Sequence, residues 1–184
     1  MADPQRQILL DERRVKRILA RMAREIVEQV GSVENLALIG IHRRGVDLAN
    51  WLAQQIERDE REPVPTGSLD ITLYRDDLMA IGPRPIVGET RLPKEGIESR
   101  VVVIVDDVLF TGRTVRAALD ELTDFGRPRR ILLSVLVDRG GRELPIHADI
   151  VGKRYTVEDG DRIEVMVPEV DGELSVSLLK GALG

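Results

Sequence analysis

The sequence predicts an α/β protein whose central, mostly parallel sheet is flanked by helices. An uninterrupted apolar run from Val101 to Val105 is typical of a central parallel strand, because such strands are buried on both faces. Segments with apolar residues at helical spacing alternate with shorter apolar runs along the chain. This alternation favours a doubly wound sheet with right-handed crossovers.

The elements before the apolar run follow from periodicity. Apolar residues recur at helical spacing from Asp11 to Val30, which predicts an opening helix. Leu69, Ile71 and Leu73 alternate with polar residues, as in a half-exposed strand. The other elements expected here are a strand from Leu36 to Ile41, a helix from Gly45 to Asp59, and a long loop, rich in Gly, Pro and charge, from Arg75 to Ser99.

One further helix and four strands are expected after the apolar run. A helix is expected from Val115 to Phe125, because its apolar residues again have helical spacing. Strands are expected at Arg130 to Val137, Ala148 to Gly152, Arg162 to Val167 and Leu174 to Leu179. Ligands of open parallel sheets bind outside the carboxyl ends of the strands, so candidate site residues are those that follow each strand.

Composition favours one domain over residues 1–184 with an aliphatic core, since 42% of the residues are hydrophobic and only 3% aromatic. The absence of cysteine excludes thiolate chemistry and fits a cytoplasmic protein. No apolar stretch has the length of a signal core or a membrane span, so we expect no membrane association. The net charge of −5 argues against indiscriminate nucleic-acid binding.

Charge is distributed unevenly along the chain. Six basic and two acidic residues lie between Asp11 and Arg24, whereas seven acidic residues and one basic residue lie between Glu158 and Glu173. The surface is therefore expected to be polarised, and a local RNA site remains compatible with the acidic average.

The apolar run ends in two adjacent carboxylates, Asp106 and Asp107, and the turn Thr111 to Thr114 follows. A glycine and free backbone N–H groups at a helix start suit a phosphate monoester. The carboxylates repel phosphate, but they can accept hydrogen bonds from a sugar diol and hold a divalent cation such as Mg²⁺. The combination predicts a site for a ribose 5-phosphate that carries further phosphate. Helix N-capping by one of the acids is the plainer alternative.

Residues Val102 to Thr114 resemble the signature with which type I phosphoribosyltransferases bind 5-phosphoribosyl 1-diphosphate (PRPP). Three further segments, Gly40 to Gly45, Leu69 to Leu78 and Val135 to Ile146, resemble the PyrR family in their order and spacing. The resemblance extends from about Ile8 to the last expected strand. It implies the type I phosphoribosyltransferase fold, with a flexible loop and a small base-binding hood.

The resemblance also assigns roles to the signature residues. Asp106 and Asp107 would bind the ribose hydroxyls and a PRPP-bound Mg²⁺ ion, and together with Arg44 they would carry catalysis. Thr111 to Thr114 would surround the 5-phosphate. The full set implied to bind PRPP or UMP is Val102, Val103, Ile104, Val105, Asp106, Asp107, Val108, Leu109, Phe110, Thr111, Gly112, Arg113, Thr114, Arg43 and Arg44.

Gly40 to Gly45 would be the pyrophosphate loop, where the family often has a non-proline cis peptide. Without the resemblance, a strand–helix turn with surface arginines is the simpler interpretation. With it, Arg43 and Arg44 become candidate ligands, and His42 is expected to be structural rather than catalytic.

The expected loop from Arg75 to Ser99 would cover PRPP and exclude water from the developing positive charge at C1. Arg75 or Arg84 would neutralise the leaving pyrophosphate, and the sequence does not choose between them. A plain surface excursion is the alternative.

The base pocket implied by the resemblance binds uracil. Purine-salvage relatives carry an acid at the position of Phe110, so this residue disfavours a purine substrate, although it could equally be a packing residue. The residues assigned to uracil are Val137, Asp138, Arg139 and Val151.

Four arginines of the opening helix, Arg14, Arg17, Arg21 and Arg24, are spaced to form one stripe away from the apolar face. A solvated charged face is the usual explanation of such a stripe. The resemblance instead implies a basic face that binds an RNA hairpin, extended by Arg142 and Lys153.

The implied protein is thus a uracil phosphoribosyltransferase that uses Mg²⁺ and also binds the leader mRNA of the pyrimidine biosynthesis (pyr) operon when UMP is present, as a homodimer or larger homo-oligomer. A salvage enzyme for another base, and an RNA-binding UMP sensor with negligible catalysis, remain open alternatives. Two departures from the family pattern lie near the expected RNA face: Gly141 stands where histidine is common, and His147 where arginine is common.

Overall fold

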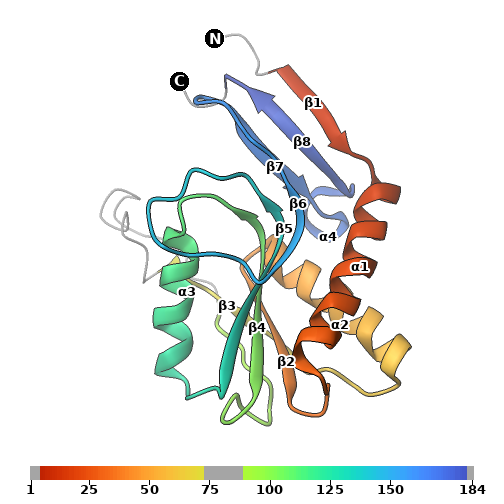
Figure 1. Ribbon diagram of the computed structural model, residues 1–184, viewed down its shortest axis with the longest axis vertical. Helices are drawn as coiled ribbons and strands as arrows, with labels where there is room; N and C mark the ends of the chain where they lie inside the picture. Colours follow the sequence, from red (N-terminus) through yellow and green to blue (C-terminus); the bar gives the residue numbers. More distant parts are fainter. Residues whose placement is uncertain (1–4, 73–88, 182–184) are drawn as a thin grey trace.

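The computed structural model describes residues 5–72 and 89–181. Its main sheet is parallel, with five strands in the order β3-β2-β4-β5-β6, as the sequence predicts for an α/β fold (Figure 1). The strands are β2 (Leu36–Ile41), β3 (Thr66–Leu69), β4 (Val101–Leu109), β5 (Arg130–Asp138) and β6 (Ile150–Arg154). The apolar run is the centre of the sheet, because β4 pairs with β2 on one side and with β5 on the other.

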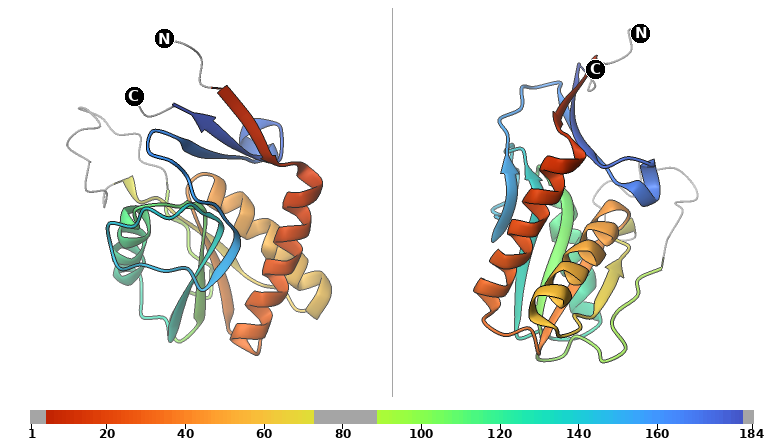
Figure 2. Two further views of the ribbon diagram at one scale, coloured as in Figure 1. Left: turned by 45° about the horizontal axis from the view of Figure 1, so that its top comes forward. Right: turned by 90° about the vertical axis from the view of Figure 1, so that its right-hand side faces the viewer.

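Helices cover both faces of this sheet. Helices α1 (Glu12–Val30) and α2 (Arg44–Glu60) lie on one face and α3 (Arg113–Asp124) on the other (Figures 1 and 2). The side chains of β4 alternate between the two layers: Val103 packs with the α1 and α2 side, whereas Val102 and Ile104 pack with the α3 side. The uninterrupted apolar pattern of β4 therefore follows from burial on both faces.

Helix α1 has the boundaries that its sequence signals predict. The side chain of Asp11 accepts a hydrogen bond from the Arg14 backbone N–H at 2.8 Å, which caps the first turn. Gly31 ends the helix with a left-handed φ of 76°. The apolar side chains Val15, Leu19, Met22 and Ile26 are buried, so the opposite face of the helix is left to the arginines.

A second, antiparallel sheet stands over the carboxyl ends of the parallel strands (Figure 1). We call it the hood. Its strands, in the order β1-β8-β7, are β1 (Gln5–Leu10), β8 (Ser175–Lys180) and β7 (Arg162–Met166), and the short helix α4 (Pro168–Asp171) joins β7 to β8. Both ends of the described chain meet in this sheet.

The structure differs from the expected elements at the segment around Leu69, and it contains two elements that the sequence analysis did not expect. The segment around Leu69 and Ile71 is not half exposed: β3 ends at Leu69, and residues Ser68 to Ile71 are buried. Arg91 forms a β-bridge with Ser68 and covers this edge, which explains the burial of the polar positions. The sequence analysis did not indicate β1 or α4. The last two expected strands correspond to β7 and β8, which belong to the hood.

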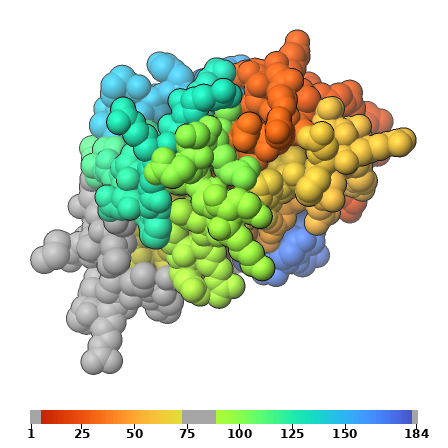
Figure 3. Space-filling view, turned by 90° about the horizontal axis from the view of Figure 1, so that it is seen from below, coloured from red at the N-terminus to blue at the C-terminus, as the bar shows by residue number. Residues whose placement is uncertain are grey.

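The face opposite the hood is built from the loops that enter the parallel strands (Figure 3). The segment from Arg91 to Arg100, light green in Figure 3, leads into β4 and is irregular apart from the bridge at Arg91, in agreement with the expected long loop. None of the helices in residues 5–72 and 89–181 has the length and apolarity needed to cross a membrane.

Candidate active site

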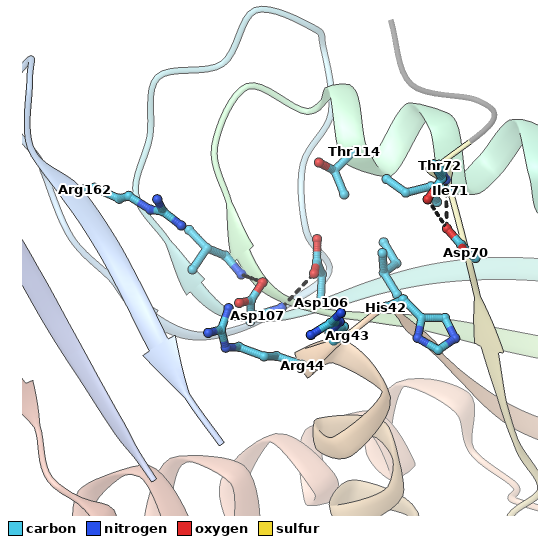
Figure 4. Close-up of a pocket in the computed structure, with 12 residues that line it drawn as sticks. His42, Arg43, Arg44, Asp70, Ile71, Thr72, Asp106, Asp107, Thr114 and Arg162 are labelled. Carbon is cyan, nitrogen blue, oxygen red and sulfur yellow. Dashed lines mark hydrogen bonds between the residues drawn. The ribbon is translucent and has the colours of Figure 1, made fainter. Parts of the chain in front are cut away.

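A cleft of about 500 Å³ opens between the carboxyl ends of the parallel strands and the hood (Figure 4). It brings together side chains from the β2–α2 turn, the ends of β3 and β4, the start of α3 and the hood strand β7. The lining residues are Ile41, His42, Arg43, Arg44, Asp70, Ile71, Thr72, Asp106, Asp107, Val108, Thr114 and Arg162. The cleft therefore lies at the place where the topology predicts a ligand.

The acid pair lies near the carboxyl end of β4, and the strand continues beyond it to Leu109. Asp106 is 6% exposed and accepts a hydrogen bond from the Asp107 backbone N–H at 2.9 Å, whereas Asp107 is half-buried. Burial and the neighbouring Asp107 carboxylate raise the pKa of Asp106 well above its ordinary value. The raised pKa means that the ionised form of Asp106 is unfavourable in the ligand-free protein. A diol that donates hydrogen bonds, or a cation, would stabilise the ionised carboxylate.

The start of α3 forms the turn that the sequence assigns to a phosphate. Gly112 occupies the cap position with φ 93° and offers no side-chain cap, so the backbone N–H groups that follow Arg113 in the first turn remain open to an anion. The Thr111 hydroxyl accepts from the Arg113 backbone N–H at 3.3 Å, and Thr114 faces the cleft. The Arg113 side chain instead forms an ion pair with Glu143 at 2.6 Å, outside the cleft lining.

The turn between β2 and α2 forms the opposite wall. The peptide bond between His42 and Arg43 is cis, as the resemblance implies. A Cβ on Gly45 would lie 2.5 Å from the Val105 carbonyl oxygen, so glycine lets this turn approach β4 beside the acid pair. His42 and Arg43 are exposed at the cleft, and the half-buried Arg44 is held by Asp171 of α4.

The apolar members of the signature do not line the cleft. Val102, Val103, Ile104, Val105 and Leu109 are at most 1% exposed and pack in the core. Their side chains form a scaffold that holds the acid pair at the edge of the sheet, and their expected contribution to PRPP or UMP binding stays a prediction. Val108 is the exception, because its half-buried side chain lines the cleft.

A second hollow of about 320 Å³ lies next to the cleft and shares Asp107, Val108 and Arg162 with it. Its other walls are Phe110, Arg139 and Ile163. The Arg139 guanidinium stacks 3.9 Å from the centroid of the Phe110 ring. We refer to this hollow as the base pocket.

Arg139 and Gly141 determine the shape of the base pocket around the Phe110 ring. Arg139 is 8% exposed, its Nε has no hydrogen-bond partner among residues 5–72 and 89–181, and burial lowers the pKa of its guanidinium. Gly141 has φ 75°, and a Cβ there would lie 2.4 Å from the Phe110 ring. The departure from the family pattern at Gly141 therefore makes room for the Phe110 ring in this position.

The other residues expected to bind uracil lie elsewhere. Val137 and Val151 are buried in the core, and neither lines the base pocket. Asp138 is half-buried and pairs with Arg142 at 2.6 Å, which lowers the pKa of Asp138 against the opposing effect of its burial. The side chains of Val137 and Val151 thus pack in the core, and the expected role of these two residues in uracil binding stays a prediction.

Several residues of the two hollows had no role in the sequence analysis, notably Asp70, Thr72, Arg162 and Ile163. One of them carried a usable signal: Arg162 is the single base in the acidic segment from Glu158 to Glu173. Asp70 accepts hydrogen bonds from the backbone N–H of Thr72 at 2.9 Å and from its hydroxyl at 2.5 Å, so it shapes the end of β3 beside the cleft. Arg75 and Arg84 lie outside the described residues.

The arginine stripe lies on the exposed side of α1. Arg14, Arg17 and Arg24 are exposed, and within the described part of the chain the side chains of Arg17 and Arg24 have no ion-pair partner. Arg21 instead pairs with Glu25 at 3.0 Å and donates to the carbonyls of Val151 and Gly152.

The two residues expected to extend the stripe differ from each other. Lys153 is exposed on β6. The Arg142 guanidinium donates to the carbonyls of Phe110 and Ile146, and it also pairs with Asp138, so its donors hold the loop that follows β5. Arg142 thus has a structural role that the sequence did not indicate.

The comparisons with known proteins agree in family and in fold. Residues 5–167 match the model of the phosphoribosyl transferase domain. A protein of Thermus aquaticus named Bifunctional protein PyrR is 55% identical over 92% of this chain and 93% of its own length. A protein of the same name from Clostridioides difficile is 51% identical over 92% of this chain and 96% of its own length.

Solved structures of hypoxanthine phosphoribosyltransferases share the architecture. The enzyme of Trypanosoma cruzi superposes with a TM-score of 0.73 at 21% identity, over 98% of this chain and 97% of that chain. The Staphylococcus aureus enzyme gives a TM-score of 0.69 at 20% identity, over 97% and 94%. These likenesses show the fold, and the sequence matches over nearly the whole chain show that it belongs to the PyrR family of phosphoribosyltransferase-domain proteins.

Proposed function

We propose that this protein transfers ribose 5-phosphate from PRPP to N1 of uracil, and that it binds the leader mRNA of the pyr operon when UMP occupies the same site. One observation carries the proposal: the acid pair, the uncapped start of α3 and the arginines of the β2–α2 turn face a single cleft beneath the hood. This is the set of groups needed for a ribose that carries phosphate at one end and diphosphate at the other.

In the proposed transfer, the bond between C1 of PRPP and its diphosphate oxygen breaks, and pyrophosphate leaves with the electron pair. N1 of uracil forms the new bond to C1 and loses its proton. Positive charge develops on the ribose ring and negative charge on the leaving group, so fixed charges on the two sides of C1 lower the barrier. The chain has no cysteine, and the mechanism requires no covalent intermediate.

The residues of the cleft divide these tasks. Asp106 and Asp107 bind the ribose hydroxyls and face the developing positive charge. The N–H groups at the start of α3, with Thr114, hold the 5-phosphate. Arg43 and Arg44 bind the diphosphate, which leaves on their side of the cleft.

A PRPP-bound Mg²⁺ ion fits this donor set. Among the described residues, no group of three or more potential ligand side chains could hold a metal ion by itself. Mg²⁺ prefers one or two carboxylates together with phosphate oxygens and water, which is what Asp106 and Asp107 beside a diphosphate provide. When bound, the ion neutralises charge on the leaving pyrophosphate.

Uracil is the proposed base because of the composition of the base pocket. Phe110 and Ile163 offer apolar walls, whereas Arg139 and Arg162 offer cations to the base carbonyls. The pocket contains no acid close to Phe110 that could assist a purine ring, apart from Asp107, which already belongs to the ribose site.

The proposed RNA surface consists of Arg14, Arg17, Arg21 and Arg24 of α1 with Lys153 of β6, and Arg142 supports it through the adjoining loop. UMP can promote attenuation only if RNA binds the UMP-bound protein more tightly than the free protein. We further propose that the protein acts in the cytoplasm and as a homo-oligomer, so that stripes from two subunits combine.

Two measurements on the intact protein test the proposal. The first is UMP formation from uracil and PRPP with Mg²⁺, run beside hypoxanthine and guanine; turnover of a purine without uracil would contradict it. The second is a titration of pyr leader RNA with and without UMP. An RNA affinity that does not respond to UMP would remove the regulatory half and leave an enzyme.

A further inference from the structure

The ion pair between Arg44 and Asp171 joins the pyrophosphate side of the cleft to the hood. Arg44 is the first residue of α2, and Asp171 is the last residue of α4. Nε of Arg44 donates to Oδ2 of Asp171 at 2.9 Å, and Nη2 donates to Oδ1 at 2.9 Å. The two side chains are 28% and 9% exposed. The contact is therefore bidentate and largely shielded from water, the geometry in which such pairs fix a guanidinium most firmly.

The Arg142–Asp138 pair is similarly shielded, with side chains 17% and 14% exposed, but it holds the loop after β5 and does not face the cleft. Several other ion pairs of the described chain are more exposed. Lys16–Glu12, Arg21–Glu25 and Arg116–Asp120 are exposed contacts between neighbouring turns of one helix. Asp171 is fixed as well as Arg44, because its Oδ2 also accepts from the Val167 backbone N–H at 2.8 Å. The Arg44 pair holds the pKa of Asp171 below its ordinary value, so the carboxylate stays charged through the neutral range.

The pair leaves part of the Arg44 guanidinium available to a ligand. Nε and Nη2 serve Asp171, and Nη2 also lies 4.0 Å from Sδ of Met166. Nη1 has no partner among the described residues, and Arg44 lines the cleft next to Asp107. An arginine has five N–H donors in a rigid fork, so one edge can bind Asp171 while the other edge meets an anion.

We propose that Asp171 is a positioning residue for the transfer reaction: it holds Arg44 so that the free Nη1 edge meets the diphosphate of PRPP and, after transfer, pyrophosphate. The inference rests on the proposed function, since it assumes that the diphosphate lies on the Arg44 side. Without Asp171, the long Arg44 side chain would regain its rotamer freedom, and each encounter with PRPP would have to order it again.

The test compares D171N with E173Q. Asparagine keeps the size of the side chain and one oxygen for Val167, but it loses the charge and the second acceptor for Arg44. Glu173 lies two residues further on, is exposed, and bonds to Arg6 and Ser175 inside the hood, so E173Q removes a hood carboxylate that does not face the cleft.

Ligands with and without diphosphate separate positioning from general support of the hood. For D171N we expect the KM for PRPP and the inhibition constant of pyrophosphate to rise about five- to tenfold, because a charge-assisted contact is weakened. The dissociation constant of UMP, which lacks the diphosphate, should change less than twofold. E173Q should behave as the wild type in all three measurements.

Three outcomes would overturn the inference. UMP binding that weakens as much as pyrophosphate binding would make Asp171 a brace of the hood. D171N that matches E173Q would leave Asp171 without a role in the reaction. If D171N does not fold, D171E keeps the charge on a longer arm, and an unchanged PRPP KM in that variant would also overturn it.

Failure of the proposed function has a different signature. Wild-type protein that neither binds PRPP in calorimetry nor forms UMP would remove the reaction itself. Wild-type protein that does both, with D171N indistinguishable from it, would remove the Asp171 inference alone.

Discussion

The cleft and the outer face of α1 both gather charges, but they hold them in opposite ways. In the cleft, Asp106 is buried and Arg44 is held by a bidentate partner. On α1, Arg17 and Arg24 are exposed and, within the described chain, unpaired. Water screens the exposed arginines of α1 more than the charges of the cleft, so a charge in the cleft interacts more strongly with a bound group.

This difference separates two kinds of function. A buried charge whose surroundings are fixed can stabilise one transition state, and its loss is not compensated by neighbours. A stripe of exposed charges can bind a polyanion through several similar contacts, so that each contributes a small and salt-dependent share. The reaction rate is accordingly expected to depend on single residues of the cleft, and the RNA affinity on the number of exposed cations in the stripe.

The largest expected effect is on the acid pair. D106N and D107N each remove a carboxylate that faces the cleft, while they preserve the shape of the side chain. We expect kcat/KM for UMP formation to fall at least about 100-fold for each variant, because charge stabilisation at C1 is lost. Initial rates at saturating uracil and varied PRPP measure the effect.

D120N is the matched control for the acid pair. Asp120 is exposed on α3 and pairs with Arg116, away from the cleft. It should keep wild-type kinetics. If D106N and D107N stay within tenfold of D120N, the cleft does not depend on single charges, and the contrast with α1 fails.

The next effect concerns the arginine stripe. R17A/R24A removes two exposed cations that no described residue pairs. We expect about a tenfold loss of affinity for leader RNA in the presence of UMP, and a salt slope that decreases by about one for each phosphate that the variant no longer neutralises. Binding isotherms at several salt concentrations give both quantities.

K16A/R58A is the control for this double variant, because it changes the net charge equally. Lys16 is not part of the stripe and already pairs with Glu12 one turn earlier on α1, and Arg58 lies on α2. Its RNA affinity and salt slope should match those of the wild type. An equal loss in both double variants would indicate attraction by net charge and not by a defined face.

The sequence predicted the cleft better than the base pocket, for a physical reason. The residues around Asp106 and Thr111 to Gly112 are local in the chain, so one strand, one turn and one helix bring them together. The base pocket combines Phe110 with Arg139 and Ile163, which come from three segments of which one is in the hood. Their meeting depends on how the hood docks, and periodicity does not encode that.

The hood itself shows the same limit. Strand β1 pairs with β8, which lies at the other end of the chain. The residues of β1 do not alternate between apolar and polar, and its apolar residue Ile8 is exposed. The sequence of this segment therefore does not mark it as a strand. Arg21 and Arg142 show the complementary case. The family resemblance implied an RNA role for both, but Arg21 donates to carbonyls of β6, and Arg142 donates to the carbonyls of Phe110 and Ile146.

A smaller effect is the pH dependence of stability. The pKa of Asp106 is raised in the folded protein, so the folded state binds its proton more tightly than the unfolded chain does. Its contribution to the free energy of unfolding is therefore fully present below the ordinary aspartate pKa, and it is lost as the pH rises through the folded pKa. D106N lacks this dependence, and its advantage over the wild type in ligand-free urea unfolding should grow across that window.

Saturating PRPP with Mg²⁺ should reduce this advantage, because the ionised Asp106 then has partners. A constant difference between D106N and the wild type at every pH would mean that Asp106 does not titrate in that window. The comparison with α1 would then lose its electrostatic basis on the cleft side.

The smallest effect lies within the stripe and compares two of its neighbours. Arg21 donates to the carbonyls of Val151 and Gly152, whereas Arg24 makes no contact of this kind within the described chain. R21A should lower the free energy of unfolding by about 1 kcal/mol, because two carbonyls of β6 lose a donor, while R24A should leave it unchanged. Urea unfolding measures this difference.

Leader-RNA titrations compare the same two variants. Both should bind RNA more weakly than the wild type, and the loss of affinity should be smaller for R21A if the Arg21 guanidinium stays on β6 in the complex. Equal stabilities for R21A and R24A would mean that Arg21 belongs to the exposed set and that α1 docks on β6 through its apolar face alone.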